Sequence, residues 1–243
     1  MLKVERPTGA AARRERGRQE MRLAIIDEAR RLVDVEGLDA VTIRGIARAL
    51  GYSPGALYEY FDSKEAILQG LYFDGTDGLG AHMQGTMATL PADVSGVEAI
   101  MALGHGYRAY ALEHAELYRL IFGGICDFSA MAPPDPDKDG GFETLLDVAQ
   151  RGVEDGTFAP VPPPVVAISA WAAVHGFVSL ELNGNLNGGH RPSTPPPTQE
   201  EQRQQRDELF AAHIRLTLFG LVRQQERTFD PVPPPEPETV GIP

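Results

Sequence analysis

The chain has 243 residues, of which 42% are hydrophobic, so it is long enough for one or two domains with a substantial core. No run of 18 apolar residues occurs and the first residues are polar and basic, so we expect neither a membrane-spanning helix nor a secretory signal. The single cysteine, Cys126, excludes a disulfide within the chain and fits a reducing cytoplasm.

The net charge of −12 is distributed unevenly along the chain. Residues 1–68 carry 12 Lys/Arg and 11 Asp/Glu, whereas residues 69–243 carry 10 Lys/Arg and 23 Asp/Glu. The excess of acid therefore belongs to the second part. Residues 1–18 are basic and are predicted to form a flexible arm, which either is simply solvated or meets an anionic partner.

The first helix is predicted over residues 19–36, because apolar residues recur there at helical spacing and Gly37 is a suitable stop. Residues 42–61 then read as two short helices joined by a tight turn. Thr42 and Ser53 are suitable N-caps, and Gly51 suits a left-handed position after the first short helix. Pro54 fits the first turn of the second. Two short helices in this arrangement are typical of a helix-turn-helix DNA-binding unit.

This segment resembles the DNA-binding signature of the tetracycline-repressor (TetR) family of bacterial regulators over about residues 18–68. The resemblance is carried by Thr42, Ala47, Gly51, Ser53, Leu57-Tyr58-x-Tyr60-Phe61 and Ser63-Lys64-Glu65. One departure is Ala56, where many relatives have threonine or another polar residue. With Gly55 and Ala56 at the front of the reading helix, we expect few direct hydrogen bonds to bases. Contacts with thymine methyl groups or with the DNA backbone are expected instead.

The resemblance implies a set of DNA-contacting residues. They are Thr42, Arg44, Ser53, Pro54, Gly55, Ala56, Tyr58, Tyr60 and Lys64. Thr42, Tyr58, Tyr60 and Lys64 would bind phosphates, and the basic arm of residues 1–18 would bind phosphates or the minor groove. Arg44 is the candidate for a base edge, because a guanidinium can pair with guanine through two hydrogen bonds. The alternative for both tyrosines is a place in the core.

The rest of the chain is also predicted to be helical, since no convincing strand pattern is present. After a helix that begins at Ser63, helices are expected at residues 94–113, 115–123, 142–154, 165–186 and 200–225. The fold class is therefore all-α, with about nine helices: a helix-turn-helix domain at 19–68 and a helical body at 69–226. Glycines within 75–85 should soften the far end of the helix from Ser63. Proline-rich spans at 133–136, 160–164 and 192–197 separate helices, and the tail, 227–243, should be extended or disordered.

Residues 106–122 and Trp171-Ala-Ala-Val-His-Gly176 resemble a ligand-binding domain named for its Trp-His-Gly motif, found in one TetR subgroup; Ala115 departs from the proline often seen there. The resemblance and the aromatic composition predict a pocket for a small, uncharged or aromatic effector. Its predicted lining is Tyr107, Tyr110, Tyr118, Phe122, Trp171 and His175. The alternative for Trp171 and His175 is ordinary packing.

The helix predicted at 165–186 is apolar nearly all round, and so is the last helix, so each should be buried on more than one side. We assign dimerisation to the stripe formed by Phe210, Ile214, Leu218 and Leu221, from which Leu209, Leu216 and Phe219 are displaced. A homodimer through a four-helix bundle implies a palindromic operator. The alternative is a larger monomeric core.

Together these features predict a cytoplasmic, one-component transcriptional regulator, most simply a repressor, that binds double-stranded DNA and is released by a small-molecule effector. No catalytic motif is present, and His105, His114 and His175 lack metal-site spacing, so we expect no enzyme activity, cofactor or metal. Two alternatives stay open. One is an architectural DNA-binding protein without an effector, and the other is an enzyme or ligand carrier with a vestigial helix-turn-helix.

Overall fold

The computed structural model describes residues 9–124, 141–187 and 198–222. The predictions for residues 1–8 of the basic arm, Cys126, two of the proline-rich spans and the tail lie outside them. The described part confirms the all-α fold. The helices are α1 (Gly9–Glu36), α2 (Ile43–Leu50), α3 (Pro54–Leu57), α4 (Lys64–Ala88), α5 (Gly96–Glu113), α6 (Ala115–Phe122), α7 (Phe142–Glu154), α8 (Pro163–Leu182) and α9 (Gln199–Leu221). Short 3-10 turns lie at Leu38–Ala40 and Asn185–Asn187.

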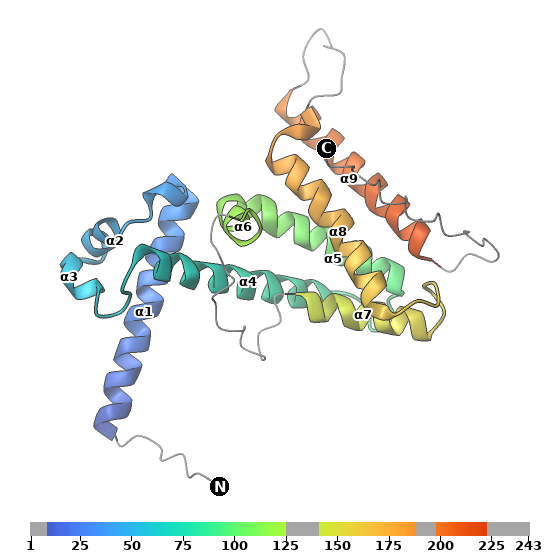
Figure 1. Ribbon diagram of the computed structural model, residues 1–243. Helices are drawn as coiled ribbons and strands as arrows, with labels where there is room; N and C mark the ends of the chain where they lie inside the picture. Colours follow the sequence, from blue (N-terminus) through green and yellow to red (C-terminus); the bar gives the residue numbers. More distant parts are fainter. Residues whose placement is uncertain (1–8, 125–140, 188–197, 223–243) are drawn as a thin grey trace, which may run out of the picture.

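The helices form two units that share α4 (Figure 1). Helices α1 to α3 lie at one end around the first turns of α4. From there α4 runs along the body, where it contacts α5, α6 and α7, while α8 and α9 pack on the far side of α5. The long α4 is therefore the structural link between the N-terminal unit and the body.

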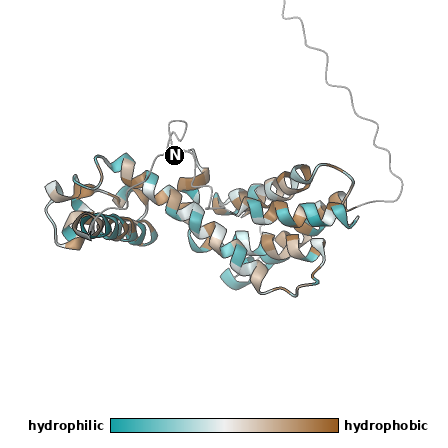
Figure 2. Ribbon diagram, turned by 90° about the horizontal axis from the view of Figure 1, so that it is seen from below, coloured by the Kyte–Doolittle hydropathy of each residue, from teal (hydrophilic) through white to brown (hydrophobic). Residues whose placement is uncertain are grey.

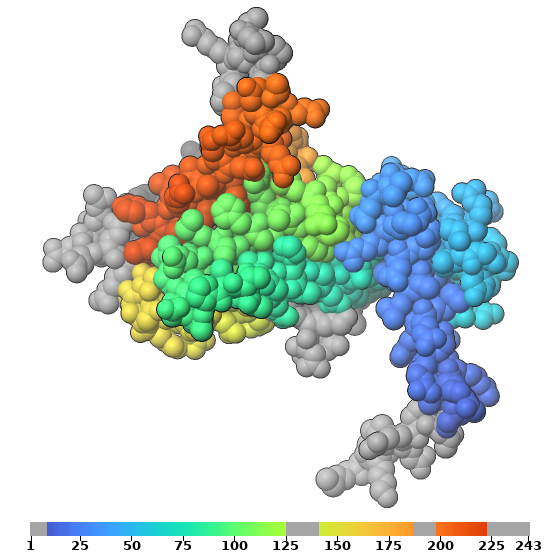
Figure 3. Space-filling view, turned by 180° about the vertical axis from the view of Figure 1, so that it is seen from behind, coloured from blue at the N-terminus to red at the C-terminus, as the bar shows by residue number. Residues whose placement is uncertain are grey.

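Helix α1 begins at Gly9, ten residues earlier than predicted, so residues 9–18 are helical and the prediction of a flexible arm is wrong for them. Seven of these ten residues are alanine or arginine, both strong helix formers, and the segment contains no proline. It projects away from the rest of the molecule (Figure 3), and hydrophilic residues predominate where α1 is seen nearly end-on (Figure 2). Helix propensity, rather than packing, accounts for its structure.

Helix α4 is continuous over 25 residues despite its glycines. A Cβ atom on Gly75 would lie 2.8 Å from Ile121 Cδ1 and 2.9 Å from Leu117 Cγ, and one on Gly78 would lie 2.6 Å from the hydroxyl of Tyr110. The two glycines thus let α6 and α5 approach α4 closely. This packing compensates for the intrinsic cost of glycine in a helix, about 1 kcal/mol each.

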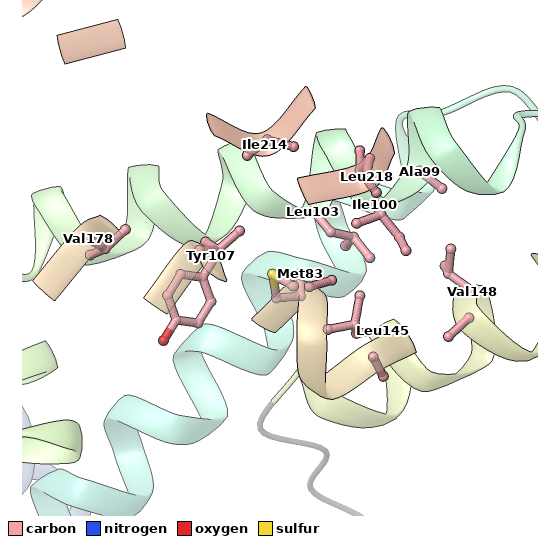
Figure 4. Close-up of a cluster of buried hydrophobic side chains, with 14 of the residues drawn as sticks. Met83, Ala99, Ile100, Leu103, Tyr107, Leu145, Val148, Val178, Ile214 and Leu218 are labelled. Atoms are coloured by element: carbon pink, nitrogen blue, oxygen red, sulfur yellow. The ribbon is translucent and has the colours of Figure 1, made fainter. Parts of the chain in front are cut away.

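The body has one hydrophobic core, formed where α4, α5, α7, α8 and α9 meet (Figure 4). Met83 of α4, Leu103 of α5 and Leu145 of α7 lie at its centre, and Ile214 and Leu218 enter from α9. All five side chains are buried. The last helix is therefore an integral part of the subunit core.

This position of α9 corrects the predicted dimer interface. Phe210, Ile214 and Leu218 are at most 2% exposed within a single chain, so these side chains cannot contact a partner, and Leu221 packs against the same core. The stripe was misassigned because the sequence shows two apolar faces without saying which one packs inward. The exposed face carries Leu209, Leu216 and Phe219 instead.

Helix α8 is also apolar on a face that the chain leaves uncovered. Val165, Ile168 and Leu180 are exposed on it, while Val166 and Val178 are buried on its inner face. By length and composition alone, α8 would suffice to cross a membrane. Its inner face belongs to the subunit core, however, so the exposed apolar residues form one side of a helix that is otherwise packed.

A buried ion cluster ties α9 to α5 and α8. The guanidinium of Arg108 donates two hydrogen bonds of 2.7 Å to Glu181 and one of 2.6 Å to Asp207. The side chains of Arg108 and Glu181 are only 9% and 5% exposed. Burial opposes the charge of Arg108, but its bonds to the two carboxylates outweigh that effect and raise its pKa.

Candidate DNA interface and effector pocket

The helix-turn-helix is held together by local caps. The hydroxyl oxygen of Thr42 accepts from the N–H of Gly45 at 3.0 Å, and that of Ser53 accepts from Ala56 at 3.3 Å. Gly51, at φ 74°, ends α2 in the left-handed conformation. These contacts satisfy backbone groups that the helix ends leave unpaired, and they confirm the predicted caps and turn.

Helix α3, the reading helix, is a single turn. It starts with Pro54 in its first turn and ends at Leu57, after which a further turn leads to Phe61. Leu57 and Phe61 are buried and anchor this segment, as predicted. Ser53, Pro54 and Gly55 are exposed, whereas Ala56 is half-buried. The exposed front of the reading helix therefore consists mainly of backbone and small side chains.

An open groove of about 440 Å³ lies between α2 and the start of α4. Thr42, Arg44, Tyr58 and Lys64 line it, so the structure brings together four of the predicted DNA-contacting residues. Asp62 also lines the groove. Tyr58 is 55% exposed, which excludes a place in the core. Within the part of the chain that the structure describes, neither Arg44 nor Lys64 forms an ion pair, so both cations are available to an anionic partner.

Tyr60 does not line this groove and is half-buried against the core of the N-terminal unit. Its backbone oxygen accepts a hydrogen bond from Arg22, whose guanidinium also lies over the ring of Phe61, 4.1 Å from the centroid. A second groove of about 320 Å³ here contains Tyr60, Arg18 and Arg22. The sequence analysis missed Arg22, although Arg14, Arg18 and Arg22 follow the spacing of one helix face.

In the body, aromatic side chains from three helices converge. Tyr107 comes from α5, Tyr118 and Phe122 from α6, and Trp171 and His175 from α8. The ring centroid of Phe122 lies 4.9 Å from those of Tyr118 and His175 and 6.3 Å from those of Tyr107 and Trp171. Five of the six residues predicted for the effector site thus form one cluster.

The polar ends of this cluster form a hydrogen-bonded chain. His175 Nδ1 lies 2.6 Å from the hydroxyl of Tyr118 and 3.1 Å from that of Tyr107, and the two hydroxyls are 3.2 Å apart. Trp171 Nε1–H points at the Tyr107 hydroxyl from 3.4 Å. Burial raises the pKa of both tyrosines and lowers the pKa of His175. All four groups are therefore neutral near pH 7.

A cavity of about 200 Å³ lies beside these rings, among α4, α5, α6, α7 and α8. Tyr107, Phe122 and Trp171 line it, as predicted, whereas Tyr118 and His175 lie in the aromatic cluster but not among the lining residues. The sequence analysis missed the remaining side chains of the wall: Tyr72, Thr76, Leu79, Met83, Ile121, Phe142 and Leu145. The four from α4 are spaced by four, three and four residues, which is the pattern of one helix face and could have identified them.

Tyr110, the sixth predicted residue, does not reach the cavity. Its hydroxyl donates to the backbone oxygen of Gly75 at 2.9 Å, and its ring packs on His114 with 4.7 Å between centroids. Tyr110 therefore joins α5 to α4. The prediction was wrong because an aromatic residue near the Tyr107 position suggested the same face, whereas the missing side chain of Gly78 lets Tyr110 turn toward α4.

The short helix α6 belongs to both units. Leu117, Leu120 and Ile121 are buried in the core of the N-terminal unit, next to residues of α1 and α4. From the adjoining positions of the same helix, Tyr118 and Phe122 enter the aromatic cluster. A change in the pocket that moves α6 must therefore be felt by the packing of the helix-turn-helix unit.

A helix-turn-helix unit joined to a helical body with an internal pocket defines a ligand-responsive DNA-binding protein. Residues 25–71 match the family model described as bacterial regulatory proteins of the tetR family. Residues 100–215 match the model of the tetracyclin repressor-like C-terminal domain. The chain belongs to the TetR family and is a transcriptional regulator. Its likeness to the Trp-His-Gly subgroup stays a prediction.

Relatives from bacteria support this assignment. The uncharacterised HTH-type transcriptional regulator Rv0681 of Mycobacterium tuberculosis is 28% identical over 68% of this chain and 72% of its own length. The HTH-type transcriptional repressor KstR2 of Rhodococcus jostii is 26% identical over 66% of this chain and 81% of its own length.

Solved structures show the same fold. A protein of unknown function from Rhodococcus sp. RHA1 superposes with a TM-score of 0.65 at 21% identity, over 83% of this chain and 95% of that one. A TetR family transcription regulator from Marinobacter aquaeolei VT8 superposes with a TM-score of 0.56 at 20% identity, over 88% of this chain and the whole of the other.

Proposed function

We propose that this regulator is a cytoplasmic repressor that binds a palindromic operator as a dimer and leaves it when a small neutral effector fills the cavity beside Trp171. The observation that carries the proposal is the dual position of α6, whose residues lie in the wall of the cavity and in the core of the DNA-binding unit. A coupling of about 1–3 kcal/mol between the two sites would lower operator affinity several-fold to about a hundredfold.

The DNA contacts divide into phosphate and base contacts. Thr42, Tyr58 and Lys64 would bind phosphates along the groove, where their side chains meet. Arg44 would read a base edge from the same groove. Because α3 offers mainly backbone and small groups, specificity should depend on Arg44 and DNA shape more than on the reading helix.

Fluorescence polarisation with the DNA upstream of the chain's own gene tests this assignment. Arg44→Ala should weaken operator binding by about 1–3 kcal/mol and binding to scrambled DNA much less. Lys64→Ala is the matched control, since loss of a phosphate contact should weaken both DNAs about equally. An equal loss for Arg44→Ala on both DNAs would remove its base-reading role. If the native chain shows no sequence preference, the whole DNA-binding proposal fails.

The dimer would form through the exposed apolar faces of α8 and α9. Leu216 and Phe219 on α9 are 74% and 66% exposed, and Ile168 on α8 is also open. Exposed apolar side chains gathered on neighbouring helices mark an interaction surface. Leu216→Glu should convert the dimer to a monomer in analytical ultracentrifugation, whereas Leu112→Glu, at an exposed position of α5, should not. A Leu216→Glu dimer would contradict this interface.

The cavity also separates the proposal from its alternatives. An architectural DNA-binding protein would need no cavity, yet about 200 Å³ of open space lies next to α6. An enzyme or carrier with a vestigial helix-turn-helix would show no operator affinity, which the polarisation experiment tests directly.

A further inference from the structure

The wall of the effector cavity carries information about the ligand, and the following inference rests on the proposed function. Among the residues that the structure describes, eleven line the cavity, and none of these eleven has a charged side chain. Among its polar groups, the hydroxyl of Thr76 is committed to the backbone oxygen of Phe73 at 2.9 Å. A ligand would therefore meet apolar surface at most points.

The hydrogen-bonded chain behind the wall has a preferred direction. The indole of Trp171 can only donate, so the hydroxyl of Tyr107 accepts from it. If Tyr107 then donates to Tyr118 and Tyr118 to His175 Nδ1, each hydroxyl hydrogen has an acceptor. The remaining hydrogen of the neutral His175, on Nε2, points toward Ser179 at 3.5 Å. The opposite order, in which Tyr118 donates to Tyr107 and Tyr107 donates to His175 Nδ1, would use the longer 3.1 Å contact to the imidazole in place of the 2.6 Å contact from Tyr118.

The hydrogen bond from Trp171 to Tyr107 is the one in this series that a ligand can replace. At 3.4 Å, the Trp171 to Tyr107 contact is longer than the 2.6 Å Tyr118 to His175 contact and lies beyond the usual range for N–H···O bonds. Trp171 is 37% exposed and lines the cavity, so its N–H can turn to a new acceptor. Tyr107 would lose only a weak donor and would keep its own bond to Tyr118.

We propose that the effector is a neutral, largely apolar molecule with one acceptor oxygen, a ketone or alcohol, that takes the indole N–H of Trp171. A carboxylate would be disfavoured, because its buried charge would meet no cation among the described residues that line the cavity. At the packing density of protein interiors, about 0.75, roughly 150 Å³ of the cavity can be filled, which corresponds to on the order of ten non-hydrogen atoms.

Three probes of nearly equal size separate these possibilities: 4-phenyl-2-butanone, butylbenzene and 3-phenylpropanoate. Isothermal titration calorimetry on the full chain should give the ketone an affinity about three- to tenfold above that of butylbenzene, the effect of one added hydrogen bond. The carboxylate should bind most weakly. A carboxylate that equals the ketone, a ketone no tighter than butylbenzene, or binding of none of the three would overturn the inference.

Two variants place the added hydrogen bond. Trp171→Phe keeps an aromatic ring but removes the donor, so the ketone should lose its advantage while butylbenzene binds within about twofold of its native affinity. Leu112→Ala, outside the cavity, should preserve the preference. A ketone preference that survives in Trp171→Phe would assign the bond to another group and overturn the inference.

Operator binding, measured on the same protein samples, separates this inference from the proposed function. If the protein binds the operator but none of the three probes, only the inferred ligand class is refuted, and the proposed DNA binding stands. The expected ligand preference without any loss of operator affinity at saturating ketone would sink release by the effector and leave the ligand class standing.

Discussion

The DNA-binding unit and the body are both helical, but different forces specify them. In the first, caps from Thr42, Ser53 and Ser63 set the helix ends within a few residues of each other. In the body, packing depends on pairs that are distant in sequence, such as Arg108 with Glu181 and Gly75 with Leu117. Local chemistry thus defines the surface proposed to bind DNA, whereas long-range packing defines the pocket and the position of α9.

The largest effect on stability is expected for the ion cluster of Arg108, Glu181 and Asp207, which holds the body together through long-range contacts. Arg108→Ala leaves the carboxylate of Glu181 buried without its main partner, so the free energy of unfolding should fall by about 3–5 kcal/mol. Urea denaturation measures the change. Arg206→Ala, which removes a partly exposed guanidinium 3.4 Å from Glu181, is the control and should cost clearly less. Equal losses would mean that the cluster does not hold the body together.

Two glycines of α4 provide a matched pair with opposite expected signs. Gly85→Ala, with open space around the position, should stabilise the protein by about 0.5–1 kcal/mol through helix propensity. Gly75→Ala gains the same propensity but crowds Leu117 and Ile121, at a cost of about 1–3 kcal/mol. Thermal unfolding of both variants measures the two changes in stability. Stabilisation by Gly75→Ala would refute a close-packing role for that glycine.

The projecting half of α1 tests whether the DNA-binding unit extends beyond the helix-turn-helix. Arg14 and Arg18 are exposed and lie one turn apart, on the same face as Arg22. If each binds one phosphate, each substitution to alanine should reduce the salt dependence of operator binding, log Kd against log salt, by about 0.9 per site. Polarisation titrations at several salt concentrations measure this slope. Arg31→Ala, on the same helix near the body, should leave it unchanged.

The smallest expected effect is a pH dependence of the body. Burial lowers the pKa of His175 and His105 below 6.5, so at mildly acidic pH the unfolded chain binds protons that the folded chain does not. Stability is therefore complete above about pH 6.5 and declines as the pH falls below that value. Urea midpoints between pH 5 and 8 should show the decline, and His175→Asn should reduce it. A midpoint that rises on acidification would contradict the assignment.

The sequence predicted the local features well because their signals are local. The caps Thr42 and Ser53, the turn at Gly51 and the anchors Leu57 and Phe61 follow from residue type and spacing, and the structure confirms them. Aromatic composition and the family resemblance likewise identified the five rings of the aromatic cluster, three of which line the cavity.

The predictions for α9 and Tyr110 were wrong because each depended on which of two possible helix faces is buried or faces the pocket. Both Phe210 and Leu216 lie on apolar faces of α9, and only the packed body shows that the first is the inner one. Tyr110 turned away from the pocket because Gly78 leaves room for it on α4. The predicted start of α1 was wrong for another reason. Helix propensity alone extends this helix through residues that make almost no contacts.

The projecting part of α1 should make operator binding depend on temperature. The projecting part of α1, residues 9–20, is about 18 Å long and has little to pack against, and an isolated helix of this length is marginal in water. Phosphates that hold its arginines would also hold its helical turns, so part of the binding enthalpy would come from protein rather than DNA. Warming, which melts short helices first, should then weaken operator binding well below the temperature at which the body unfolds.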